Sequence, residues 1–136
     1  MIRDIKTYLA ADSGLATLLN SNAGNTKLFP LVANNPAGET TPYILYSYST
    51  DAFLDDIVSE AIVQLSIISE NYDDAIAIAF KLDELLDVKD NVSFTSDRFH
   101  FYSSYKSGGN DAKESNTNLF NVTKLYTIKF KRKGAY

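Results

Sequence analysis

Several residue types that often carry chemistry are scarce in this chain of 136 residues. It contains no cysteine, which excludes disulfide bonds, thiolate metal sites and cysteine nucleophiles. His100 is the only histidine, and it lacks an evident partner of the kind that orients a general base. We therefore expect no enzyme, no cofactor and no bound metal.

Long apolar runs are also missing. No stretch approaches the roughly 18 residues that a membrane-spanning helix needs, and the first residues lack the apolar core of a secretory signal. The net charge of -4 argues against a nucleic-acid-binding protein. Hydrophobic residues make up 45% of the chain, enough for one packed core, so we expect a single domain over residues 1–136.

Hydrophobic spacing predicts helices in two regions. Ile2, Ile5 and Leu9 recur at helical spacing, and the pattern continues as a bent amphipathic helix through GLATLLN, with Asp12 or Ser13 as a cap. The clearest helix is ENYDDAIAIAFKLDELLDVKD, residues 70–90, with Asn71 or Asp73 as its cap. Its apolar stripe consists of Ala75, Ile78, Ala79, Leu82, Leu85 and Leu86. Beside this stripe, Ile76 and Phe80 either widen the core or begin a second, intermolecular face.

Four segments read as strands: PYILYSYS, EAIVQLSIIS, DRFHFYSSYK and LFNVTKLYTIKFKRK. The order helix-strand-strand-helix-strand-strand predicts an α+β fold, with a four-stranded antiparallel sheet and the helices on one face. Residues 20–42 read as a long connection. Its apolar residues Leu28, Phe29, Leu31 and Val32 are expected to tuck under the edge of the domain.

The second predicted strand has two unlike faces. Val63, Leu65 and Ile67 share an apolar face that should meet the helices. The opposite face carries Gln64, Ser66 and Ile68. The last strand adds Thr127 to it, whereas its Val122, Tyr126, Ile128 and Phe130 share the other parity. This mixed face suits a contact with another subunit, although a solvated face is the alternative.

The segment KSGGNDAKESNTN, residues 106–118, reads as a polar loop between the last two strands. It is longer than the roughly two to five residues of an ordinary hairpin turn. We expect it to be mobile in the monomer and ordered by another chain in an assembly; a tip without a role is the alternative. The predicted contact residues are Gly108, Gly109, Asn110, Asp111, Lys113, Glu114 and Asn116.

Charged side chains gather in two places. The carboxylates Asp51, Asp55, Asp56 and Glu60 lack the spacing of a calcium loop and read as a solvated acidic turn. The basic end of the chain holds Lys129, Lys131, Arg132 and Lys133. It reads as a guard on an edge strand, with a nucleic-acid-binding arm as the alternative.

In this order, the segments resemble the tail-completion or tail-terminator proteins of long-tailed bacteriophages. The resemblance extends over nearly the whole chain, from LAADSGLATLL through LFPLVA and TPYILYSYS to the two closing strands. Its most recognisable parts are the entry Thr41-Pro42-Tyr43 and the strand followed by an alanine-rich helix at residues 60–87. The long 106–118 segment departs from the pattern.

The resemblance implies a structural virion protein that is assembled in the host cytoplasm. Such proteins form rings, often hexamers, at the head-proximal end of the tail tube, where they end tube polymerisation and contact the head-tail connector protein. The implied partners are therefore other copies of the chain, the major tail tube protein and the connector. DNA would pass through without specific binding, so we expect a net acidic pore with some of Asp51, Asp55, Asp56 and Glu60 facing it.

Three other classes remain open at this point. A nucleic-acid-binding module with a ferredoxin-like sheet would need Tyr46, Tyr48 and Tyr102 on one exposed face among basic residues. A salt-dependent gel shift separates it from a virion protein. An adaptor without a phage context is the second alternative, and a small enzyme is the third.

Overall fold

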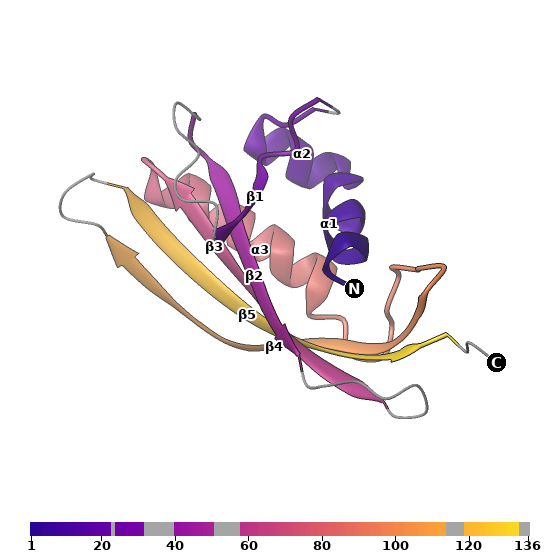
Figure 1. Cartoon of the computed structure of the whole chain (residues 1–136). Coiled ribbons are helices and arrows are strands. Elements are labelled where there is room, and N and C mark those ends of the chain that lie inside the picture. Colours follow the sequence, from indigo (N-terminus) through magenta and orange to yellow (C-terminus); the bar gives the residue numbers. More distant parts are fainter. Residues whose placement is uncertain (23, 32–39, 51–57, 114–118, 134–136) are drawn as a thin grey trace.

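The computed structural model describes residues 1–22, 24–31, 40–50, 58–113 and 119–133. Three helices lie on one face of a five-stranded sheet, and Figure 1 shows the opposite face of the sheet free of helices. The helices are α1 (Ile2–Ala10), α2 (Ser13–Leu19) and α3 (Tyr72–Leu86). The strands are β1 (Leu28–Pro30), β2 (Tyr43–Thr50), β3 (Ser59–Ser69), β4 (Phe99–Lys113) and β5 (Phe120–Arg132).

The α+β class and the placement of the helices are as predicted, but the sheet is not the four-stranded antiparallel one expected. Its order is β1-β2-β3-β5-β4, and the additional strand β1 pairs in parallel with β2. The segment around Leu28 is therefore a strand and not an island beneath an edge. A strand of three residues has no alternating pattern of its own, so only its pairing with Ile44–Tyr46 reveals it.

The N-terminal segment forms two helices where one bent helix was predicted. Asp12 interrupts the helical pattern because its carboxylate accepts a hydrogen bond from the Leu15 backbone N–H at 2.8 Å and so begins α2. Asn71 begins α3 in the same way, accepting from the backbone N–H groups of Asp73 and Asp74. The expected caps at Asp12 and Asn71 are thus confirmed.

The core lies between the helices and the sheet. Ile78 and Leu82 of α3 pack in one buried cluster with Val63 and Leu65 of β3 and Tyr126 of β5. The predicted inward faces of α3, β3 and β5 are therefore correct. Ile76 joins the rim of this cluster, whereas Phe80 remains 69% exposed and takes no part in the core.

The predicted loop at residues 106–118 is wrong for residues 106–113, which continue β4. They pair antiparallel with β5 from Lys106 opposite Tyr126 to Lys113 opposite Phe120. Ser, Gly, Asn and Asp have low strand propensity, so the local sequence reads as a loop. The ladder offered by the long β5 strand overrides that propensity. Glu114 and Asn116 lie outside the described residues.

The last strand also differs from its prediction. β5 is an interior strand between β3 and β4, so its lysines do not guard a sheet edge. The long edge strand is instead β4, with 15 residues and shifts of register between Phe101 and Ser103 and between Lys106 and Gly108. Such irregularities twist an exposed edge away from unintended pairing.

Candidate functional site: the open face and the two ends of the sheet

The open face of the sheet carries a row of hydrogen-bonded polar side chains. Gln64 donates to the Ser66 hydroxyl at 3.4 Å, and that hydroxyl lies 3.3 Å from the hydroxyl of Thr123 on β5. Thr123 donates in turn to the Asn121 side-chain oxygen at 3.1 Å. Because these groups bond to one another, part of their hydrogen bonding would be kept if another surface replaced solvent on this face.

The predicted contact residues on this face differ in exposure. Gln64 is partly exposed, whereas Ser66, Ile68 and Thr127 are only 3%, 5% and 7% exposed in the single chain. Ile68 belongs to a small apolar cluster with Tyr43 and Leu45 on the side of the sheet away from the main core. A subunit contact through this face therefore remains a prediction, and Gln64 is the member most accessible to a partner.

One end of the open face bears an exposed ion pair. Glu60 on β3 lies directly opposite Lys129 on β5, and their charged atoms are 3.6 Å apart. An exposed pair of this kind contributes at most about 1 kcal/mol to stability. Asp51, Asp55 and Asp56 lie outside the described residues, so a pore lined by the four acids remains a prediction.

Asp83 of α3 and Asp87, the residue that follows the helix, hold the edge strand β4 near its second shift of register. Asp87 accepts from the Lys106 backbone N–H at 2.9 Å, and Asp83 forms an ion pair with the Lys106 ammonium at 3.2 Å. Asp83 also accepts from the Tyr126 hydroxyl at 2.6 Å. Burial, followed by this hydrogen bond to Asp83, raises the pKa of Tyr126 above its ordinary value. These contacts join α3, β4 and β5 at one point.

The far part of β4 is anchored by another tyrosine. The Tyr72 hydroxyl donates to the Asp111 carboxylate at 2.7 Å, and the Tyr72 ring packs on Phe120 with centroids 5.3 Å apart. The hydrogen bond to Asp111 is the main cause that raises the pKa of Tyr72. Asp111 is thus a predicted contact residue with a role within its own chain. Its neighbours Gly108, Gly109 and Asn110 lie on the edge strand.

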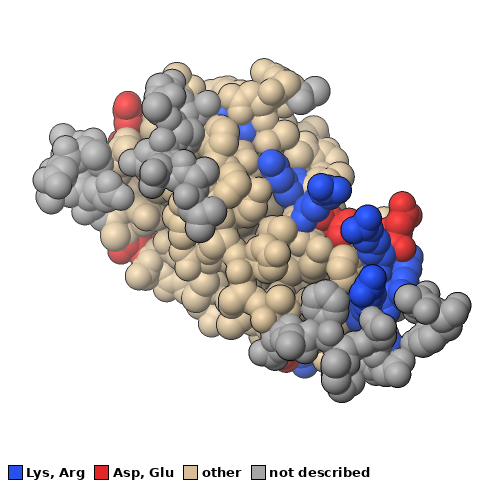
Figure 2. Space-filling model, viewed as in Figure 1, with Lys and Arg blue, Asp and Glu red and all other residues tan. Residues whose placement is uncertain are grey.

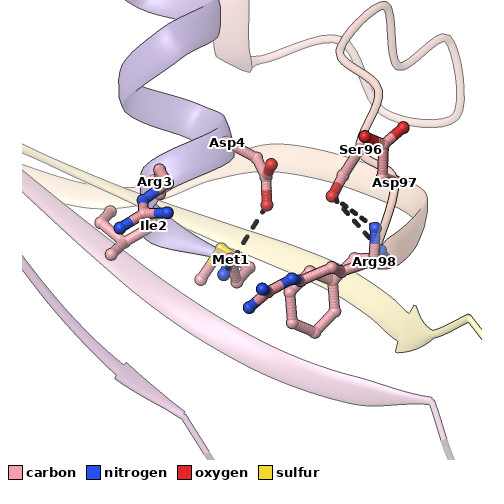
Figure 3. A pocket seen from close by; sticks show the side chains of 8 residues that line it. Met1, Ile2, Arg3, Asp4, Ser96, Asp97 and Arg98 are labelled. Carbon is pink, nitrogen blue, oxygen red and sulfur yellow. Dashed lines mark hydrogen bonds and ion pairs between the residues drawn. The ribbon is translucent and has the colours of Figure 1, made fainter.

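The opposite end of the sheet contains a hollow that the sequence analysis missed. It has a volume of about 370 Å³ and is lined by Met1–Asp4 and Ser96–Phe99. Figure 3 shows Arg3 and Arg98 on either side of Met1, with Asp4 above Met1 and Asp97 beside Ser96. Arg3 and Arg98 are 95 residues apart in sequence, so only the fold reveals the pair.

The chemistry available in the described part of the chain is limited. No group of three or more His, Cys, Asp or Glu side chains there could hold a metal ion. The His100 ring lies 4.7 Å from the ring of Tyr102 and across the ladder from Lys131, so its neighbours do not form a catalytic triad. None of the described helices is long and apolar enough to cross a membrane.

The three tyrosines proposed as a nucleic-acid platform do not share one open face. Tyr46 packs against the main core, and Tyr48 lies opposite the core residue Val63. Tyr102 instead contacts His100 on β4. Because base stacking needs neighbouring exposed rings, this division argues against a nucleic-acid-binding module.

Comparison with known proteins gives a match at the level of the fold. No family model matches the sequence, and no curated protein matches it. A chain of the solved structure "Virion of native gene transfer agent (GTA) particle" superimposes with a TM-score of 0.67. The match covers 95% of this chain and 92% of that chain, at 14% sequence identity. The two chains therefore share their fold over nearly their whole length.

Proposed function

We propose that this chain is a structural virion protein that forms a ring at the head-proximal end of a phage-like tail tube. The ring, a hexamer in this proposal, ends tube polymerisation and provides the contact with the head-tail connector protein. The main support is the fold shared over 95% of the chain with a component of a gene transfer agent virion. The order of sequence segments that resembles tail terminators supports the same conclusion independently.

The surfaces described above are consistent with this role. A ring subunit needs one surface for its neighbours, one for the tail tube protein and one for the connector, and it needs no catalytic group. The sheet has an open face with a hydrogen-bonded row of polar groups, and a 15-residue edge strand, β4, whose outer side pairs with Lys89 at Ser104. These provide contact surfaces on rigid elements, and we propose no enzymatic activity for the chain.

The proposed role is tested by deleting the gene for this chain in a strain that produces the particles. We expect tail tubes of uncontrolled length and heads without tails by electron microscopy, with normal particles restored by the wild-type gene. The Thr17→Ala variant serves as a control that changes a small exposed side chain of α2, outside the sheet, and should complement fully. Tails of normal length attached to heads in the deletion strain would refute the proposal.

The proposed acidic pore has a separate test. Asp55→Lys combined with Asp56→Lys would bring positive charge to the DNA path, where phosphates bind cations in a salt-dependent way. We expect slower DNA ejection from otherwise normal particles. Unchanged ejection, or ring coordinates that put this turn on the outer rim, would contradict the acidic pore without affecting the ring itself.

A further inference from the structure

The two ends of the sheet carry opposite charge. The basic end brings together the first turn of α1, the segment before β4 and the last residues of β5, with the cations Arg3, Arg98, Arg132 and Lys133. The acidic end comprises the start of α3 and the far part of β4, with the carboxylates Glu70, Asp73, Asp74 and Asp111. Figure 2 shows blue side chains gathered at the right of the molecule with red ones beside them, and only red ones at the left edge.

The cations of the basic end are held together by the backbone. The Lys133 N–H donates to the Arg98 carbonyl at 2.7 Å, and Phe99 pairs with Arg132 across the ladder. Arg3 and Arg98 line the hollow together with Asp4 and Asp97. Asp4 is paired with the Met1 ammonium group at 3.7 Å. Among the described residues, neither guanidinium forms an ion pair. Two arginines at one hollow provide planar donors suited to carboxylates.

The acidic end is equally exposed. Glu70, Asp73 and Asp74 are all exposed, and they form no ion pairs within the described part of the chain. The β3–β5 ladder spans 11 residue pairs between the two ends, from Ser59 opposite Phe130 to Ser69 opposite Phe120. At about 3.3 Å per residue the ends are about 30 Å apart, too far to neutralise each other within one chain.

We propose that the hollow at the basic end binds the acidic end of a second copy of this chain, so that neighbouring copies join head to tail. This inference rests on the proposed ring and identifies one of its contacts. A head-to-tail contact generates a closed ring when its rotation closes. A two-fold contact between basic ends would instead bring like charges together. DNA is a weaker candidate for this end, because the chain as a whole is net acidic.

The contact is tested with two variants of reversed charge. One carries Arg3→Glu and Arg98→Glu, and the other carries Glu70→Lys and Asp74→Lys. Sedimentation and mass photometry at low ionic strength should show wild-type oligomers that dissociate as salt rises. Each variant should self-associate at least about 100-fold more weakly, because like charges meeting in an interface cost two or more decades of affinity. An equimolar mixture should assemble again. When the two variants alternate, the reversed end of one meets the reversed end of the other and the unchanged ends meet each other, so every contact joins opposite charges.

A control variant separates the local contact from net charge. Lys81→Glu with Lys89→Glu changes the net charge by the same amount as the double arginine reversal, but at positions outside both ends, and it should assemble as the wild type does. Circular dichroism checks that each variant is folded. Wild-type protein that stays monomeric at low ionic strength, or folded variants whose mixture does not recover, would overturn the head-to-tail contact.

Two further results distinguish the possible failures. Short duplex DNA that binds the wild type and is lost with Arg3→Glu and Arg98→Glu would assign the hollow to nucleic acid and overturn the self-contact. Wild-type rings that neither charge reversal disrupts would overturn it too, while leaving the proposed function standing. If the mixture recovers but the chain is absent from the tail end of particles, the proposed function fails and the contact holds.

Discussion

The two faces of the sheet are formed by the same strands, but one face is apolar and buried and the other carries hydrogen-bonded polar side chains. On the covered face, Val63, Leu65 and Ile67 of β3 are buried against the helices. On the open face of the same strand, Gln64 and Ser66 form a hydrogen-bonded row with β5. Alternating side chains therefore let one strand serve a core and a polar surface at once. The covered face contributes burial, whereas the open face contributes a surface that a partner can contact.

The largest effect should come from the covered face. We expect Leu82→Ala in α3 to lower the free energy of unfolding by about 3 kcal/mol, because Leu82 is fully buried and its loss leaves a cavity. Leu125→Ala on the partly exposed open face removes the same atoms and should cost about 1 kcal/mol. Urea unfolding measures both. Equal losses would contradict the division of the sheet into a core face and a surface face.

The paired glycines of β4 give the next contrast. Gly109 has a φ of 151°, and a Cβ there would press on the Thr123 carbonyl oxygen, which is backbone and cannot move aside. Gly109→Ala should therefore cost about 2 kcal/mol. Gly108→Ala would place its Cβ 3.3 Å from the end of the flexible Leu125 side chain and should be better tolerated. Hydrogen exchange should show loosening of β4 beyond residue 108 in the first variant only.

Tyrosine hydroxyls on the two faces should also differ. Tyr126→Phe removes the bond to Asp83, and we expect a loss of about 1–1.5 kcal/mol, with Tyr105→Phe on the open face as a near-neutral control. The pKa of Tyr126 is raised in the folded state, so the stability it contributes is full below about pH 10 and is lost as pH rises further. The decrease in the free energy of unfolding above about pH 10 should therefore be smaller in Tyr126→Phe than in the wild type.

The smallest effect is expected in the polar row. Thr123→Val keeps the side-chain shape but removes a hydroxyl that lies between Ser66 and Asn121. Because Ser66 keeps its hydrogen bond with Gln64 and Asn121 is partly exposed, the free energy of unfolding should change by less than about 1 kcal/mol. Assembly should change more than stability if this face is a subunit contact. A large loss of stability with unchanged assembly would show that the row belongs to the folded chain alone.

Local sequence determined most of the elements and their inward faces. Alternation of apolar and polar residues identified both faces of β3 and β5, because successive side chains of a strand point to opposite faces of the sheet. Helical spacing identified α3, and the capping side chains of Asp12 and Asn71 identified where two helices begin. These features depend on residues within a few positions of one another, so a sequence shows them directly.

The tertiary structure alone decided the features that depend on distant partners. β1 and the second half of β4 are strands because β2 and β5 offer ladders to them, against weak local propensity. The interior position of β5 follows from β4 pairing on its outer side. The hollow beside Arg3 and Arg98 forms because the start of α1 lies next to the segment before β4. Strand pairing and contacts between residues far apart in the sequence leave no local pattern, so only the folded structure reveals them.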